Sequence, residues 1–117
     1  MRITWGFIDK EASMEEILSH VGPGWHGIVK ALIDDLDLLE WDGELYQIKE
    51  KNASLRFYIG RSTNAILKRI EQAEQDSFKT CEQCGRPGSL YTRGRWLVIL
   101  CPSCASRENP PAIIHQQ

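Results

Sequence analysis

The sequence lacks several features that would place it in a membrane, outside the cell or on nucleic acid. Its longest apolar runs, such as residues 96–100, fall far short of the roughly 18 residues that a membrane-spanning helix needs. Residues 1–6 show neither the apolar stretch nor the cleavage site of a secretory signal peptide. A formal net charge of −2 provides no basic surplus for general polyanion binding. These absences predict a soluble, cytoplasmic protein without a membrane partner.

Catalytic signatures are equally scarce. The chain has no Ser-His-Asp, Cys-His or glycine-rich phosphate-binding motif. Its three histidines, His20, His26 and His115, are too scattered in sequence for a metal site of recognisable spacing. We therefore expect no enzymatic activity and no catalytic residues.

The chain does contain enough apolar material to fold, with 42% hydrophobic and 26% charged residues. Its 117 residues suit one small domain, or a domain with a smaller appendage. Charge divides it unevenly. Residues 1–78 hold fourteen acidic and nine basic side chains, whereas residues 79–117 hold two acidic and five basic ones. An acidic body is therefore succeeded by a mildly basic section.

Hydrophobic periodicity predicts three helices and one hairpin in the acidic body. Helical spacing covers residues 10–21, residues 25–39, and a segment from a cap at Ser62 or Thr63 to about Ser77. Residues 44–51 and 55–59 read as strands joined by the three-residue link 52–54, an antiparallel hairpin. We expect the second and third helices to pack on one face of it. The apolar residues available to the core include Trp5, Phe7, Ile8, Met14, Ile17, Leu18, Val21, Trp25, Ile28, Val29, Leu32, Ile33, Leu36, Leu39, Leu55, Phe57, Ile59, Ile66, Leu67, Ile70 and Ala73.

All four cysteines lie in the basic section, as two C-x₂-C pairs separated by sixteen residues. The pairs are Cys81 with Cys84 and Cys101 with Cys104. Two intervening residues allow a tight turn to aim both thiolates at one ion, and sixteen residues suit a hairpin that returns the second pair to the first. The spacing therefore predicts one structural Zn²⁺ ion in a closed four-cysteine site.

Two other roles for the cysteines are less consistent with the sequence. Disulfides are a hallmark of secreted proteins, and nothing indicates secretion. A thioredoxin-like redox motif requires a single C-x-x-C at a helix start within a βαβ unit, which this sequence does not offer. Bound zinc would change the formal charge from −2 to −4, since four thiolates and one Zn²⁺ add −2.

These patterns together predict an α+β fold in which helices pack on an antiparallel hairpin and a zinc ribbon forms the C-terminal part. Gly85 would end the first cysteine turn, and Gly88 and Gly94 lie where the ribbon hairpin would bend. The predicted division is an acidic α+β body at 1–78, a zinc ribbon at 79–105 and a tail at 106–117. We expect residues 108–117 to be frayed.

Two groups of side chains are candidates for binding a partner. Lys49, Lys51 and Arg56 form a basic cluster on the hairpin, although pairing with nearby carboxylates explains them more simply than a phosphate site. On the ribbon, Arg86, Arg93 and Arg95 flank Tyr91 and Trp96, a mixture that can stack on and neutralise nucleic acid. The candidate partner-binding residues are Lys49, Lys51, Arg56, Arg93, Arg95 and Trp96.

Several motifs in fixed order resemble a family of small uncharacterised proteins of phages, prophages and bacteria. They are Gly24-Trp25, residues 47–51 (QIKEK) with 55–58 (LRFY), Ala73-Glu74, residues 81–88 (CEQCGRPG) and the G-x-W-L of residues 94–97. The resemblance covers about residues 22–105 and implies zinc binding, an intracellular setting and a mobile-element origin. Cys104 replaces the histidine that often ends the family's ligand set, and Asn52-Ala53 replaces its Phe-Gly.

Three classes of function remain open. The first is a non-enzymatic module that binds a protein partner, for example a phage inhibitor of a bacterial defence such as a CRISPR complex. The second is a nucleic-acid-binding accessory protein, whose binding would depend steeply on salt. The third, an enzyme, would require a catalytic group in a cleft with a strongly perturbed pKa. We favour the protein-binding module; the sequence does not indicate an oligomeric state.

Overall fold

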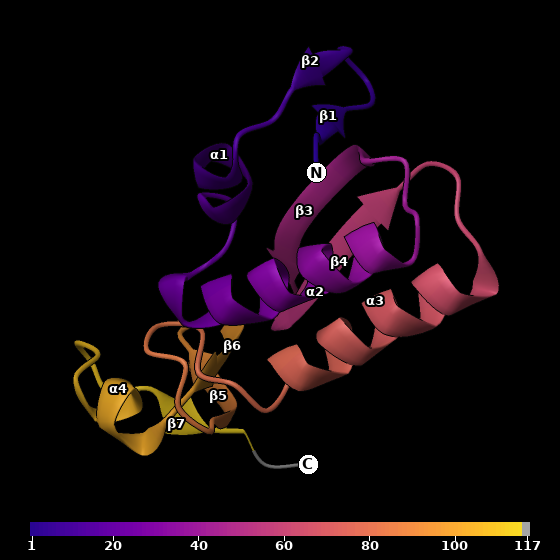
Figure 1. The fold of residues 1–117 in the computed structure, drawn as a ribbon. Coiled ribbons are helices and arrows are strands. Elements are labelled where there is room, and N and C mark those ends of the chain that lie inside the picture. Colours follow the sequence, from indigo (N-terminus) through magenta and orange to yellow (C-terminus); the bar gives the residue numbers. More distant parts are fainter. Residues whose placement is uncertain (116–117) are drawn as a thin grey trace.

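Two sheets and two long helices make up residues 1–115, the part of the chain that a computed structural model describes (Figure 1). The first sheet has the strand order β2-β1-β3-β4, with β1 and β3 parallel and the other neighbours antiparallel. The second, antiparallel throughout, has the order β6-β5-β7. The predicted α+β class is confirmed. The elements are β1 Thr4–Trp5, β2 Lys10–Glu11, α1 Met14–Leu18, a 3₁₀ turn Pro23–Trp25, α2 His26–Leu38, β3 Glu44–Lys51, β4 Ser54–Ile59, α3 Asn64–Ser77, β5 Ser89–Arg93, β6 Trp96–Leu100, α4 Pro102–Ser106 and β7 Ile113–Ile114.

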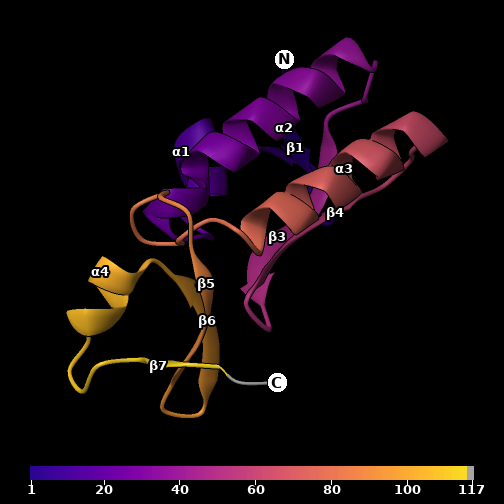
Figure 2. The same cartoon turned by 90° about the horizontal axis from the view of Figure 1, so that it is seen from below.

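Helices α2 and α3 lie side by side on one face of β3 and β4 (Figures 1 and 2). Leu32 of α2, Ile70 of α3 and Phe57 of β4 belong to one buried core, so the predicted packing of both helices on the hairpin is confirmed. The hydroxyl of Thr63 starts α3 by accepting the Ile66 N–H at 3.2 Å. Three apolar residues of the predicted helices are instead exposed: Met14, Leu39 and Leu67.

The turn between β3 and β4 differs from the prediction. Lys51 pairs with Ser54, so the link has two residues, Asn52 and Ala53, rather than three. Both have positive φ, 51° and 65°, as the tight hairpin turn that matches strand twist requires. A carboxylate oxygen of Glu50 accepts the Ala53 N–H at 2.8 Å and holds the turn in this conformation.

The N-terminal segment was predicted as one helix over residues 10–21, and this prediction is wrong at both ends. Residues 10–11 form β2, which pairs with β1. The helix then begins at Met14, because the Ser13 hydroxyl accepts the Glu16 N–H at 3.0 Å and the Glu16 carboxylate accepts the Ser13 N–H in return. Phe7 and Ile8, which we expected in the core, are 65% and 54% exposed.

The predicted frayed tail is also wrong for the residues that the structure describes. Ile113 and Ile114 form β7, which pairs with Thr92 and Tyr91 of β5. The His115 N–H donates to the carbonyl of Leu90 at 2.9 Å. Helix α4, Pro102–Ser106, was absent from the prediction and lies just before this stretch. The last two residues of the predicted tail, 116–117, lie outside the described residues.

Candidate metal centre

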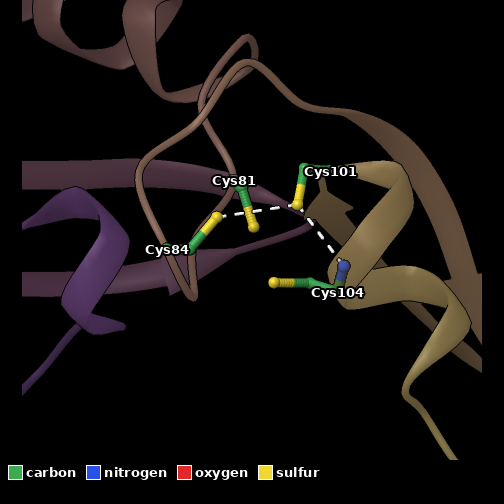
Figure 3. Close-up of side chains that lie close together, drawn as sticks. All are labelled: Cys81, Cys84, Cys101 and Cys104. Carbon is green, nitrogen blue, oxygen red and sulfur yellow. Dashed lines mark hydrogen bonds between the residues drawn. The ribbon is translucent and has the colours of Figure 1, made fainter.

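The four cysteine sulfurs converge on one point between the two C-x₂-C turns (Figure 3). All four Sγ atoms lie within 4.8 Å of one another, and the Sγ atoms of Cys84 and Cys101 are 3.6 Å apart. In a tetrahedral zinc–thiolate site with bonds of about 2.3 Å, the sulfurs are about 3.8 Å apart. The four side chains therefore fit a single tetrahedral metal ion.

The first turn lies between α3 and β5 and is held by its own backbone. The Cys81 N–H donates to the Arg86 carbonyl at 2.7 Å, and the Gly85 N–H donates to the Cys81 carbonyl at 2.9 Å. Gly85 has a φ of +81°, which a side chain would strain, and it ends the turn as the sequence predicts. These bonds direct Cys81 and Cys84 toward the same point.

The second turn joins the end of β6 to α4. Cys101 is the N-cap of α4, and Pro102 occupies the first helical position, where a missing N–H costs nothing. The Cys104 N–H lies 3.4 Å from the Cys101 sulfur, to which it donates. Strands β5 and β6 pair from Ser89 opposite Leu100 to Arg93 opposite Trp96, so this hairpin brings the second turn back to the first.

The surrounding backbone and burial separate the acidities of the thiols. The Cys104 N–H lowers the pKa of the Cys101 thiol to about 6, whereas burial raises the pKa of the Cys104 thiol to about 12. For Cys81, burial raises the pKa, but N–H groups of Cys84, Cys101 and Gln83 outweigh it and the net shift is downward. Closely packed thiols are a suitable site for a divalent cation, which displaces their protons on binding.

One residue near the thiols was missed by the sequence analysis. The Arg107 guanidinium donates from Nη2 to the Cys104 sulfur at 3.4 Å and from Nε to the Ser103 carbonyl at 3.3 Å. A four-thiolate zinc site carries a net charge of −2, so a cation on a sulfur partly neutralises it. Arg107 lies three residues after the last cysteine, and α4, which was not predicted, brings it to the metal site.

The first cysteine turn is also attached to the body. The indole Nε1 of Trp25 donates to the Thr80 carbonyl at 2.8 Å, and the Gly24 N–H donates to the Glu82 carbonyl at 2.8 Å. Ile99 of β6 is 1% exposed and belongs to the main core of the body. The metal centre and the helical body therefore share packed contacts.

The structure brings three of the candidate partner-binding residues, Lys51, Arg95 and Trp96, together at the end of the β3–β4 hairpin. Lys49 lies directly opposite Arg56 on the neighbouring strand. Arg93 forms an ion pair with Glu108, with 3.0 Å between the guanidinium Nη1 and a carboxylate oxygen. Lys51 and Asn52 line a cavity of about 380 Å³ together with residues 95–97 of the β5–β6 turn. Within residues 1–115, Lys49, Lys51, Arg56 and Arg95 form no ion pair. Burial raises the pKa of Glu74 and the nearby Arg56 lowers it, so the pairing of the hairpin cations with carboxylates stays a prediction.

Comparison with protein-family models, with curated proteins and with solved structures finds no match. No helix among the described residues is long and apolar enough to cross a membrane. The resemblance to phage and bacterial proteins therefore stays a prediction, and the functional argument depends on the site itself.

Proposed function

We propose that the protein is a non-enzymatic, zinc-stabilised module that binds a protein partner. The observation that carries the proposal is the convergence of four thiols within 4.8 Å of one another. Four cysteine ligands fill a tetrahedral ion and leave no position for water or substrate, so the metal has a structural role. Zinc would hold the C-terminal sheet as a zinc ribbon; four sulfurs also suit iron, and metal analysis distinguishes the two.

A binding role is supported by the side chains that the fold leaves exposed. Trp96 is 74% exposed beside Arg95, and tryptophan and arginine are the residue types that most often dominate protein interfaces. The net charge of −2 disfavours a general nucleic-acid surface. A bacterial defence complex is the first partner to test, because the family resemblance suggests a phage or prophage origin.

The test is a pull-down with the tagged, metal-loaded full chain from bacterial lysate, with and without nuclease treatment, read by mass spectrometry beside metal analysis of the bait. We expect one zinc per chain and a stoichiometric polypeptide that survives nuclease. Recovery of nucleic acid alone, lost after nuclease, would replace this proposal with the nucleic-acid-binding one. Iron in place of zinc would change the metal but not the binding role.

A further inference from the structure

The outer side of the β3–β4 hairpin and the β5–β6 turn beside it carry four cations that form no ion pair within the described residues. Lys49 and Lys51 are two positions apart on β3, so their side chains leave the same face of the sheet, and Arg56 lies opposite Lys49 on β4. Arg95 lines the same cavity as Lys51. We call Lys49, Lys51, Arg56 and Arg95 the basic strip.

The pairing of Lys49 with Arg56 is unfavourable in the isolated chain, because like charges directly opposite on neighbouring strands repel. The Nε of Arg56 is buried without a hydrogen-bond partner. Glu74 of α3 interacts with Arg56: burial raises the pKa of Glu74 and Arg56 lowers it, with a net upward shift. An anionic group on this face would relieve the repulsion.

Hollows with exposed apolar side chains lie at both ends of the basic strip. Beside Lys49 is a cavity of about 350 Å³ whose lining includes Phe7, Ile8 and Tyr46. Beside Lys51 is the cavity of about 380 Å³ whose lining includes Trp96. Cationic and apolar surface therefore alternate across the body and the C-terminal sheet.

Resting on the proposed function, we infer that this face binds an acidic segment of the partner protein whose carboxylates meet the basic strip and whose apolar side chains enter the two hollows. Charge complementarity favours such a peptide over nucleic acid. Glu16 lines one hollow and Glu50 the other, so a peptide can place uncharged apolar side chains there and its carboxylates on the basic strip, whereas a phosphate backbone carries a charge at every nucleotide.

The test is selection of random peptides of ~12 residues on the zinc-loaded full chain, since an extended peptide of that length spans about 40 Å. The molecule itself extends 42 Å along its longest axis. We expect enriched peptides to combine a net negative charge with aromatic or aliphatic residues. Enrichment without an acidic bias would overturn the inference, as would tighter binding of a dodecathymidylate probe than of the selected peptides.

Matched charge reversals locate the binding surface. We expect the double variant Lys51→Glu with Arg95→Glu to weaken a selected peptide at least tenfold. The control, Lys30→Glu with Lys68→Glu, makes the same change in net charge on exposed positions of α2 and α3 and should change the affinity less than twofold. Equal weakening by both double variants would overturn the inference. Zinc content and circular dichroism of each variant establish that it is folded.

The same variants separate this inference from the proposed function. If the pull-down recovers one polypeptide equally with the native chain and with the Lys51→Glu, Arg95→Glu variant, the protein-binding function stands and the basic strip is not its site. If neither bait recovers a polypeptide, the proposed function itself fails.

Discussion

The indole of Trp25 donates a hydrogen bond to the carbonyl of Thr80, 55 residues away, at 2.8 Å. Trp25 is 0% exposed and leads into α2, while Thr80 directly precedes the first cysteine of the metal centre. The bond therefore joins the core of the body to the backbone that directs Cys81 and Cys84 toward the other two thiols. Stability of the body and metal binding should depend on each other through this contact.

Replacing this tryptophan tests the coupling. Trp25→Phe removes the donor from a partly buried carbonyl and leaves a cavity in the core, so we expect a loss of about 2 kcal/mol in unfolding free energy. Zinc affinity, measured by competition with a chromophoric chelator, should fall as well. The control Trp96→Phe changes an exposed indole and should stay within about 0.5 kcal/mol. A loss of stability with unchanged zinc affinity would contradict the coupling.

Removal of the metal tests the same contact from the other side. The Gly24 N–H donates to the Glu82 carbonyl inside the first cysteine turn at 2.8 Å. A Cβ at Gly24 would lie 2.0 Å from the Cys81 carbonyl oxygen, so the two segments touch directly. With a strong chelator present, hydrogen exchange at Gly24 should accelerate together with exchange at β5 and β6. Acceleration in the C-terminal sheet alone would show that metal binding does not stabilise the body at Gly24.

Loss of one thiol should abolish the site. In Cys84→Ser the ion would keep three thiolates, and because structural zinc supplies much of the folding free energy of such small units, we expect zinc stoichiometry to fall from one toward zero. The measurement is metal analysis of purified protein beside a thermal melt. Ser103→Ala, a change between the other two cysteines that removes no ligand, is the control. Native zinc content and an unchanged melt in Cys84→Ser would exclude the four-cysteine site.

The Arg107 contact predicts a smaller effect. Arg107→Gln removes the charge 3.4 Å from the Cys104 sulfur but leaves all four ligands, so zinc should still bind, about tenfold more weakly. Arg86→Gln, at an exposed position in the first turn, controls for the loss of one positive charge. Chelator competition on both variants gives the comparison. Equal weakening by the two variants would attribute the effect to net charge instead of to the hydrogen bond.

Local signals in the sequence predicted most of the fold. The apolar spacing of α2, with Leu32 and Leu36 buried, and the alternation of Leu55 and Phe57 in β4 depend on neighbours in the chain, and both were predicted correctly. The cysteine pairs were equally visible because their ligand geometry needs a fixed spacing. The structure brings Cys81, Cys84, Cys101 and Cys104 together as that spacing predicts.

The errors fall where pairing between distant segments decides the structure. Residues 10–11 were assigned to the helix that precedes Gly22, yet they pair with β1. Ile113 forms a strand because it pairs with Thr92 at the edge of β5. The residues around Pro110 and Pro111 show no local pattern that predicts this strand. The Arg107 guanidinium contacts the Cys104 sulfur because α4 directs the chain after Cys104 back toward the thiols. Such relationships are set by tertiary contacts, which a single sequence does not contain.

A final prediction concerns the repulsion between Lys49 and Arg56. Lys49→Glu would replace a like-charge cross-strand pair by an opposite-charge pair, so we expect the isolated chain to gain about 0.2–1 kcal/mol in unfolding free energy. The gain should shrink as salt is added, because partly exposed charges are screened, whereas a packing effect would not. Lys30→Glu on α2 is the control for the same change in net charge.

The same Lys49→Glu variant should bind acidic peptides more weakly, since the basic strip loses one cation. A variant that is more stable yet binds acidic peptides less tightly would show that the Lys49–Arg56 repulsion lowers stability while both cations contribute to binding. Unchanged stability at low salt would mean that the two side chains already avoid each other in the free protein.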